Sequence, residues 1–256
     1  KIINNIGKDV VEYKVIDPSD DPLSPKSGTL HYGATMIKGN FTAIDGRGFD
    51  VHITGVGCLL VYEVIDIIIH GLSIHHCKPE TSCNIMGPNG KAIPLGQVDR
   101  DAIRVVSARK VWIDHNILYE CPDGLLDVTC GSTNVTVSNN WFRDQDKVML
   151  LGHDDGYLED KNMKVTVTLN YFGPNCNQRM PRVRYGYVHV ANNFYQGWEQ
   201  YAPFSFHSPL SSSWPTKRSS FTVHRATTTP VADDTKVDLQ PHSKVLGSRG
   251  DGSRFG

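Results

Sequence analysis

The fold is decided by four short segments in the middle of the chain: VWIDHN at 111–116, VTVSNN at 135–140, VTVTLN at 165–170 and VHVANN at 188–193. Each segment is an alternating, β-branched run that ends in asparagine. The closing asparagines follow one another at intervals of 24, 30 and 23 residues, at Asn116, Asn140, Asn170 and Asn193. A short strand repeated at such a period, with no helical pattern between the copies, indicates a solenoid.

Among solenoids, a parallel β-helix fits these segments best. Leucine-rich repeats have a similar period, but their leucine spacing is missing here. In a β-helix the strands of successive coils stack about 4.8 Å apart. An asparagine at one bend of each coil can join a ladder of side-chain amides, and it tolerates left-handed backbone angles there. The longest interval, between Asn140 and Asn170, then contains a loop, and a β-sandwich with coincidental asparagines is the alternative.

The composition excludes several classes of protein. With 26 Lys and Arg against 27 Asp and Glu, the net charge is −1, which argues against a nucleic-acid-binding surface over the whole molecule. No apolar run approaches the ~18 residues of a membrane span. The chain starts at Lys1 without a signal-peptide pattern, which indicates a removed leader or a fragment. Glycosylation sequons at Asn40 and Asn134 favour a secreted glycoprotein.

The six cysteines show no zinc-type spacing. An earlier apolar run at 67–72 ends well before Asn116, and we interpret the interval between them as about two coils. Cys77 and Cys121 would then lie about 10 Å apart, which is too far for a disulfide. The pairing of the cysteines is otherwise left open by the sequence.

The end of the chain differs from the repeat region. Residues 203–256 contain 10 Ser, 6 Thr, 5 Pro and 4 Gly, and the pattern of strands ending in asparagine stops there. We therefore expect a β-helical domain at 1–202 and an irregular tail at 203–256 that is poorly ordered or loosely packed.

Four carboxylates recur at the coil period. Asp99 and Asp101 flank Arg100, and one coil period after Asp99 the segment DGLLD runs from Asp123 to Asp127. Residues two or four apart on a strand share a face, so stacked coils would bring all four carboxylates together. Such a group repels itself unless a cation intervenes, and Ca²⁺ takes about 6–8 oxygen ligands. The alternative is an ordinary solvated acidic surface.

A basic set follows the carboxylates. It consists of Lys147 and of the segment QRMPRVR at 178–184, which carries Arg179, Arg182 and Arg184. Arg179 lies farther along the chain than Asp123, and coil stacking could place it on the same face. Cations beside Ca²⁺ suit an anionic polymer whose carboxylates need several counter-charges. The alternative is a solvated edge of the fold.

Two other groups give weaker signals. Asp114 and His115 suggest a catalytic relay, but adjacent residues on a strand face opposite ways, so we interpret His115 as structural. The segment His153-Asp154-Asp155 resembles a metal site but falls in an expected loop. The chain has no Gly-x-Ser-x-Gly elbow and no glycine-rich phosphate loop.

Longer motifs carry a resemblance to a known family. They are GTL at 28–30, TAIDGRG at 42–48, IIIHGL at 67–72, VWIDH at 111–115, DGLLDVT at 123–129, KVMLLGHDD at 147–155 and QRMPRVRYG at 178–186. Through these motifs the chain, from about residue 20 to residue 201, resembles the plant pectate lyases of polysaccharide lyase family 1, a group that includes pollen allergens.

The resemblance implies an all-β, right-handed, single-stranded parallel β-helix. It also implies a secreted, monomeric cell-wall enzyme that cleaves de-esterified pectin (polygalacturonate) by calcium-dependent β-elimination. Carried over by position, the calcium carboxylates are Asp99, Asp101, Asp123 and Asp127. Lys147 and Arg184 resemble the residues that bind substrate carboxylates, Arg179 resembles the general base, and the VWIDH motif is structural.

The chain departs from the family in three places, and these motivate alternatives. Arg100 stands where the family has glycine, the stretch 32–44 is shorter by about one coil, and residues 203–256 replace further coils. A catalytically weak or inactive pectin-binding protein of the allergen type is therefore the second hypothesis. A pectin lyase is disfavoured because a methyl-esterified substrate offers no carboxylate for calcium bridging. A polygalacturonase-type hydrolase is disfavoured because the run 178–186 does not match that group.

Overall fold

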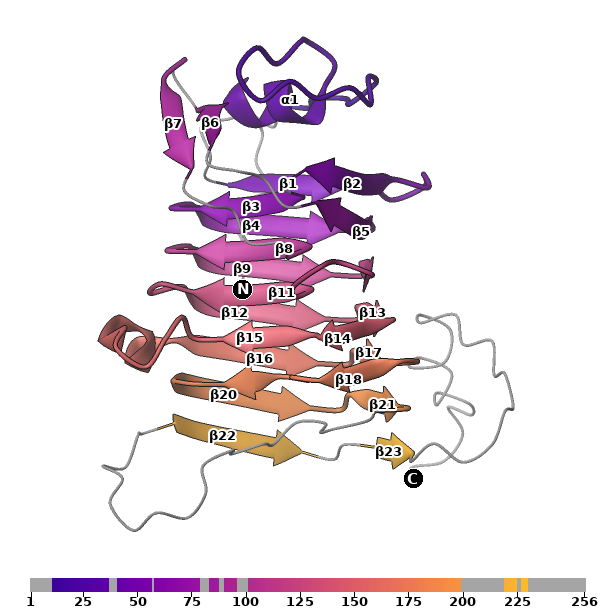
Figure 1. The fold of residues 1–256 in the computed structure, drawn as a ribbon, viewed down its shortest axis with the longest axis vertical. Coiled ribbons are helices and arrows are strands. Elements are labelled where there is room, and N and C mark those ends of the chain that lie inside the picture. Colours follow the sequence, from indigo (N-terminus) through magenta and orange to yellow (C-terminus); the bar gives the residue numbers. More distant parts are fainter. Residues whose placement is uncertain are drawn as a thin grey trace, which may run out of the picture.

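Three parallel sheets run along the molecule in a computed structural model that describes residues 11–36, 41–56, 58–78, 83–87, 90–95, 101–198, 219–224 and 227–229 (Figure 1). Successive turns of the chain add a strand to one sheet after another, and the strands stack in the same direction. The pair β6–β7 is the one antiparallel pairing among the described residues. The chain is therefore a right-handed parallel β-helix, and the predicted fold class is confirmed.

The first sheet, called sheet A here, contains the four repeat segments. In stacking order its strands are β1 (Thr42–Asp45), β4 (Ile65–His70), β9 (Arg109–Asp114), β12 (Thr133–Ser138), β16 (Lys164–Thr168), β20 (Gly186–Ala191) and β22 (Ser219–His224).

Two further sheets complete each coil. Sheet B contains β2 (His52–Val56), β5 (Ser73–Lys78), β10 (Ile117–Tyr119), β13 (Trp141–Arg143), β17 (Tyr171–Phe172), β21 (Phe194–Gln196) and β23 (Thr227–Thr229). Sheet C contains β3 (Leu59–Tyr62), β8 (Ile103–Val106), β11 (Leu126–Thr129), β15 (Met149–Leu151) and β19 (Arg182–Val183). A short parallel pair, β14 (Gln145–Lys147) with β18 (Cys176–Gln178), precedes the last two strands of sheet C.

Branched aliphatic residues fill the interior because alternate residues of each strand point inward. In sheet A one inward column lies in register through five coils and is almost fully buried: Ile69, Ile113, Val137, Val167 and Val190. In sheet B the rings of Phe142, Phe172 and Tyr195 stack, with centroids 5.0 Å apart at each step. The core is thus a set of columns in which each coil contacts mainly its neighbours.

The predicted asparagine ladder is present at the bend after sheet A. The side-chain Nδ2 of Asn116 donates to Oδ1 of Asn140, Asn140 donates to Asn170, and Asn170 donates to Asn193, each at 3.0 Å. Each of these oxygens also accepts the backbone N–H of the preceding ladder residue. Because all four asparagines are buried, the ladder satisfies polar groups that water does not reach.

The left-handed backbone angle was predicted for the ladder asparagines themselves, and this detail was wrong. The residue before each of them has the positive φ: His115 (57°), Asn139 (56°), Leu169 (59°) and Asn192 (53°). The ladder residue directs its amide inward along the stack, so the preceding residue makes the sharp bend.

Longer intervals in the repeat correspond to excursions of the chain. The interval between Asn140 and Asn170 contains the predicted loop, here residues 152–163 with the 3-10 helix η1 (Leu158–Asn162). The fully buried carboxylate of Asp160 holds this loop, since it accepts the backbone N–H of Gly131 at 2.7 Å and of His153 at 2.6 Å. At the other end of the molecule, α1 (Leu30–Met36) and the hairpin β6 (Cys83–Met86)–β7 (Ala92–Leu95) lie beyond the first coil (Figure 1).

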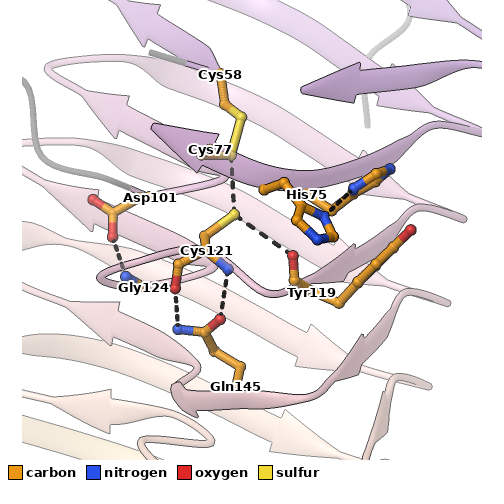
Figure 2. The surroundings of a disulfide bond; sticks show 9 residues. Cys58, His75, Cys77, Asp101, Tyr119, Cys121, Gly124 and Gln145 are labelled. Atoms are coloured by element: carbon orange, nitrogen blue, oxygen red, sulfur yellow. Dashed lines mark hydrogen bonds between the residues drawn. A yellow bond between two sulfur atoms is a disulfide. The ribbon is translucent and has the colours of Figure 1, made fainter. Parts of the chain in front are cut away.

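The interval between the run at 67–72 and Asn116 was interpreted as two coils, and this interpretation was wrong. Strand β4 pairs directly with β9, and β5 pairs with β10, so the interval is one coil that carries the hairpin β6–β7. Cys77 and Cys121 therefore lie on adjacent coils, with sulfur atoms 2.9 Å apart (Figure 2). The disulfide joins Cys77 to Cys58 instead, and Cys121 is a buried free thiol.

The predicted tail contributes two described strands. β22 pairs in parallel with β20, and β23 pairs with β21, so sheets A and B continue past residue 202. Most of 203–256 lies outside the described residues, and the division of the chain at 202/203 stays a prediction. Within the described residues no helix has the length and apolar composition that a membrane span requires.

Candidate active site

Three of the predicted carboxylates lie near the N-terminal ends of two neighbouring strands of sheet C, β8 and β11. Asp101 lies two residues before the start of β8, Asp123 lies in the turn before β11, and Asp127 lies on β11. Strands β8 and β11 belong to adjacent coils and pair with Arg104 opposite Asp127. The parallel register therefore brings residues that are far apart in sequence to one edge of the sheet.

Gly124 holds two of these carboxylates close together. Its backbone N–H donates to Oδ1 of Asp101 at 2.8 Å (Figure 2). A Cβ added at Gly124 would lie 2.5 Å from Oδ1 of Asp101 and 3.2 Å from Oδ1 of Asp127. The carboxylates of Asp101 and Asp127 thus converge on a point that no side chain can occupy, and this explains the glycine of the DGLLD segment.

The surroundings of Asp127 disfavour the ionised form of its carboxylate. Burial, followed by the neighbouring charges of Asp101 and Asp123, raises the pKa of Asp127 well above its usual value. Arg179 and Arg104 act in the opposite direction but do not compensate. Asp101 and Asp123 therefore lie close enough to Asp127 to oppose its ionisation.

The third carboxylate, Asp123, faces a cation. Nζ of Lys147 lies 2.9 Å from Oδ1 of Asp123, from the next coil. The turn that carries Asp123 is fixed by buried Gln145, which donates to the carbonyl of Asp123 at 2.7 Å and to that of Cys121 at 2.9 Å. The N–H of Cys121 donates back to Gln145 Oε1 at 2.9 Å, so the amide of Gln145 is fully engaged (Figure 2).

The arginines come from the following coil. Arg179 has a left-handed backbone (φ 62°), and its carbonyl accepts the N–H of Met149 at 2.7 Å. Its buried Nε has no hydrogen-bond partner within the described part of the chain. The guanidinium of Arg184 donates to the carbonyl of Gly152 at 3.3 Å and to that of His153.

These arginines crowd one another. Burial, followed by the charges of Arg182 and Arg179, lowers the pKa of Arg184, while Asp155 and Asp127 act to raise it. The site therefore combines repelling carboxylates with repelling guanidinium groups. A ligand that carries negative charge, together with a divalent cation, would relieve both kinds of repulsion.

Comparison with known proteins identifies the family. A family model described as pectate lyase matches residues 35–255. The chain belongs to the pectate lyase family. Similar members are pectate lyase 1 of Chamaecyparis obtusa, 48% identical over 219 residues, and probable pectate lyase 4 of Arabidopsis thaliana, 45% identical over 216 residues. Each alignment covers 77% of this chain.

The solved structures agree with this assignment of the fold. The crystal structure of Jun a 1, the major allergen from cedar pollen, matches with a TM-score of 0.74 and 35% identity, over 90% of this chain and 82% of that one. The chain spans 58% of the length of the Chamaecyparis pectate lyase and 55% of that of the Arabidopsis protein.

In this member of the pectate lyase family, six of the seven predicted site residues lie in one region of sheet C. They are Asp101, Asp123, Asp127, Lys147, Arg179 and Arg184. Asp99 and Arg100 lie outside the described residues, so the fourth carboxylate and the substitution beside it stay predictions.

The reason given for the convergence of Asp123 and Asp127 was incorrect. The sequence predicts Asp123 and Asp127 on one strand, but Asp123 belongs to a turn and only Asp127 is on a strand. The offset between the coils at this edge is slightly shorter than the interval from Asp99 to Asp123, so Arg104 faces Asp127 in register. Arg104, whose Nε lies 3.8 Å from Oδ2 of Asp101, was not predicted, because the 24-residue interval counts back from Asp127 to Ile103 and not to Arg104.

The expectation that the side chains of Asp114 and His115 face opposite ways was also wrong. Nδ1 of His115 lies 2.6 Å from Oδ2 of Asp114, because the left-handed backbone of His115 turns its ring back. Ser138 donates to Asp114 rather than to a histidine, at 2.6 Å, so no serine is activated here as in a catalytic triad. In the predicted loop, Nε2 of His153 is 3.4 Å from Oδ2 of Asp154.

Proposed function

We propose that this protein cleaves de-esterified pectin by calcium-dependent β-elimination, giving unsaturated oligogalacturonides. The supporting observation is that Asp101 and Asp127 converge at Gly124, with Asp123, Lys147, Arg179 and Arg184 in the same region of sheet C. Membership of the pectate lyase family supports the same reaction.

The donor set fits a hard divalent cation. The three described carboxylates offer only oxygen ligands, and Asp99 would add a fourth carboxylate. The raised pKa of Asp127 means that the carboxylates need an external positive charge to ionise together. When bound, Ca²⁺ would supply charge neutralisation for the carboxylates of the protein and of the uronate.

Lys147 and Arg184 are assigned to the carboxylates of the polymer. The reaction removes the proton α to a uronate carboxylate, and negative charge then builds up on that group. Lys147 reaches the carboxylate region through its contact with Asp123, and Arg184 is held by backbone carbonyls. Fixed cations in these places stabilise the developing charge without having to reorganise.

Arg179 is assigned as the base that takes this proton. Guanidinium groups are normally protonated, so this role requires an arginine that can release a proton to solvent first. The buried Nε of Arg179 has no carboxylate bonded to it among the described residues, so that nitrogen is not fixed as a donor. The charges of Arg182 and Arg179 act together on Arg184, so the three guanidinium groups lie near one another in this region.

The experiment is an elimination assay with purified protein, polygalacturonate and Ca²⁺, followed by the ultraviolet absorbance of the unsaturated product. The wild-type protein is expected to form product only with Ca²⁺, and Arg179→Ala to lose about 10²–10⁴-fold in kcat. Arg109→Ala, which removes an exposed arginine of sheet A, is the matched control. Binding of polygalacturonate without any product would instead support the pectin-binding, allergen-type alternative.

The same proposal includes an extracellular setting. A secreted, monomeric glycoprotein of the cell wall is expected, with the pectate polymer as its partner. The sequon residue Asn134 has an exposed side chain on β12, as an occupied glycosylation site requires. Asn40 of the other sequon lies outside the described residues.

A further inference from the structure

A second group of ligand-type side chains converges at the end of sheet A, away from the carboxylates of sheet C. His70 ends β4, Asp114 ends β9 on the next coil, and His115 follows it. One ligand atom from each residue lies within 4.8 Å of the other two. It is the one group of three or more such side chains that converges in this way within the described residues.

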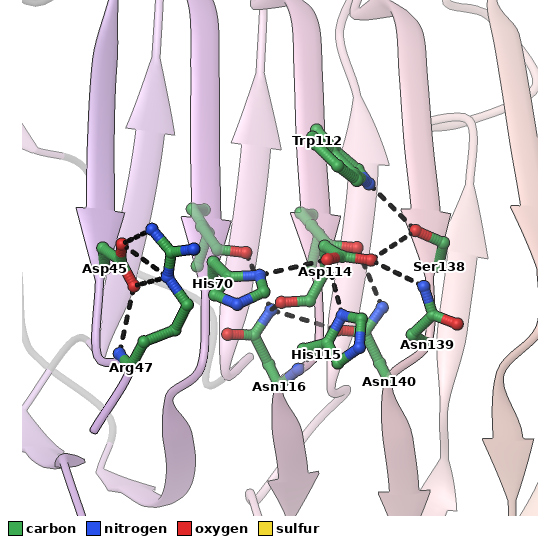
Figure 3. A network of polar contacts seen from close by, with 12 residues as sticks. Asp45, Arg47, His70, Trp112, Asp114, His115, Asn116, Ser138, Asn139 and Asn140 are labelled. Atoms are coloured by element: carbon green, nitrogen blue, oxygen red, sulfur yellow. Dashed lines mark hydrogen bonds and ion pairs between the residues drawn. The ribbon is translucent and has the colours of Figure 1, made fainter. Parts of the chain in front are cut away.

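The contacts within the group have a common centre. Nδ1 of His70 lies 3.0 Å, and Nδ1 of His115 2.6 Å, from the same oxygen, Oδ2 of Asp114 (Figure 3). The two imidazole rings have their centroids 5.1 Å apart and are tilted by 45°. Two ring nitrogens and one carboxylate oxygen therefore point at a shared volume.

The fold sets this geometry in two ways. Parallel pairing of β4 with β9 places His70 directly opposite Asp114. The positive φ of His115 then bends the chain sharply after β9, so that its ring returns to the same carboxylate. The arrangement therefore depends on backbone register and on a bend, not on flexible side chains.

The other oxygen of Asp114 is already engaged. Oδ1 accepts Ser138 Oγ at 2.6 Å and Asn139 Nδ2 at 2.9 Å (Figure 3). Burial acts to raise the pKa of Asp114, but hydrogen bonds from Ser138, Asn139 and His115 keep it below the usual value. The carboxylate is thus ionised and oriented by its neighbours, as the ligands of protein metal sites commonly are.

We propose that His70, Asp114 and His115 bind a divalent transition-metal ion such as Zn²⁺ or Cu²⁺. The ion takes the place of the hydrogens that the two Nδ1 atoms share with Oδ2, and each imidazole then carries its hydrogen on Nε2. Two nitrogens and one oxygen leave a fourth position for water, which is a common coordination of Zn²⁺. The side chains of His70 and His115 are 21% and 32% exposed, so water and the ion reach the site.

This site differs in chemistry from the proposed calcium site. Imidazole nitrogen suits Zn²⁺ and Cu²⁺, whereas Ca²⁺ prefers oxygen ligands alone. The inference therefore does not depend on the proposed enzymatic function. Saturating Ca²⁺ should leave transition-metal binding unchanged.

Another histidine group must be separated from this one. His52, His75 and His76 form a row on sheet B, with Nδ1 of His52 2.8 Å from Nε2 of His75, and Nδ1 of His75 2.6 Å from Nδ1 of His76. The ring of His75 stands between the other two, and its two nitrogens point in different directions. This row therefore offers no single point for three ligands, but its imidazoles could compete for added metal, so two of them are replaced in the test.

The test uses the full chain carrying His75→Gln and His76→Gln, titrated with Zn²⁺ by calorimetry in excess Ca²⁺. One Zn²⁺ per chain is expected. His70→Gln, whose amide can still donate to Asp114, is expected to weaken binding at least tenfold. His189→Gln, which removes an exposed histidine elsewhere on sheet A, should leave the affinity unchanged.

The proposal is overturned if this protein binds no Zn²⁺, or if His70→Gln and His189→Gln bind it equally. Electron paramagnetic resonance of bound Cu²⁺ gives a readout that needs no site variant. Hyperfine coupling to two imidazole nitrogens is expected in the parent protein. Coupling to none or to one contradicts the assignment, even if a variant at His70 fails to fold.

Discussion

Asn140→Ala tests how strongly the asparagine ladder holds neighbouring coils together. The Asn140 side chain accepts the backbone N–H of Asn116 at 2.9 Å and its Nδ2 at 3.0 Å. It donates to the carbonyl of Ile113 at 2.9 Å and to Oδ1 of Asn170 at 3.0 Å. The substitution removes all four hydrogen bonds from a residue with no exposed surface.

The size of the effect follows from which partners are left unsatisfied. The amide of Asn116 still donates to two carbonyl oxygens, and Oδ1 of Asn170 still accepts the backbone N–H of Asn140. The buried backbone N–H of Asn116 loses its acceptor, which costs about 1–3 kcal/mol. Together with the lost packing of the amide, we expect a decrease of ~3 kcal/mol in the free energy of unfolding.

Urea denaturation followed by circular dichroism measures this decrease as a lower midpoint at an unchanged m-value. Asn177→Ala is the control, since it removes a single surface hydrogen bond to Asp146, and we expect less than about 1 kcal/mol for it. Equal midpoints for Asn140→Ala and Asn177→Ala would refute the view that the ladder stabilises the stack.

Three further predictions concern the site and the disulfide. In Gly124→Ala the new Cβ displaces Asp101 and Asp127, so calorimetry should show calcium affinity at least about tenfold weaker, and unchanged affinity would contradict the convergence of these carboxylates. Because the pKa of Asp127 is raised, its favourable contribution exists at low pH and is lost as the pH rises through that pKa. Asp127→Asn should therefore raise the thermal midpoint of the calcium-free protein at neutral pH, and a lower midpoint in chelator would argue against this repulsion. Cys58→Ser removes the disulfide to Cys77, which joins residues 19 apart in the sequence, and should lower the free energy of unfolding by about 3 kcal/mol. Thermal denaturation measures this decrease, and Cys130→Ser should lower the free energy of unfolding much less.

The asparagine spacing was sufficient to predict the fold because the spacing in the sequence and the stacking of the coils have the same physical cause. A buried amide at each bend must find a partner on the next coil, so the sequence repeats where the structure stacks. The carboxylate and arginine groups were predictable for the same reason, since coil stacking relates positions about one period apart. Gly124 became interpretable only when its Cβ position was known to meet two carboxylates.

What the sequence did not reveal depends on backbone details within a coil. The interval that separates the run at 67–72 from Asn116 has the length of two coils, or of one coil with a hairpin, and only strand pairing separates these cases. The contact of His115 with Asp114 depends on a left-handed angle at a residue type that does not require it. Arg104 belongs to no motif, and its place opposite Asp127 follows from a register slightly shorter than the interval between Asp99 and Asp123.

The asparagine ladder also gives the molecule a direction. In every rung the amide nitrogen belongs to the earlier coil and the oxygen to the later one, from Asn116 through to Asn193. The side-chain dipoles therefore point the same way along the axis and add up, and each hydrogen bond polarises the next. Two such columns placed end to end can continue one another only head to tail. At the early end, α1 and the β6–β7 hairpin lie beyond the first coil (Figure 1), so a second molecule that approached this end would meet these elements as well as a strand edge.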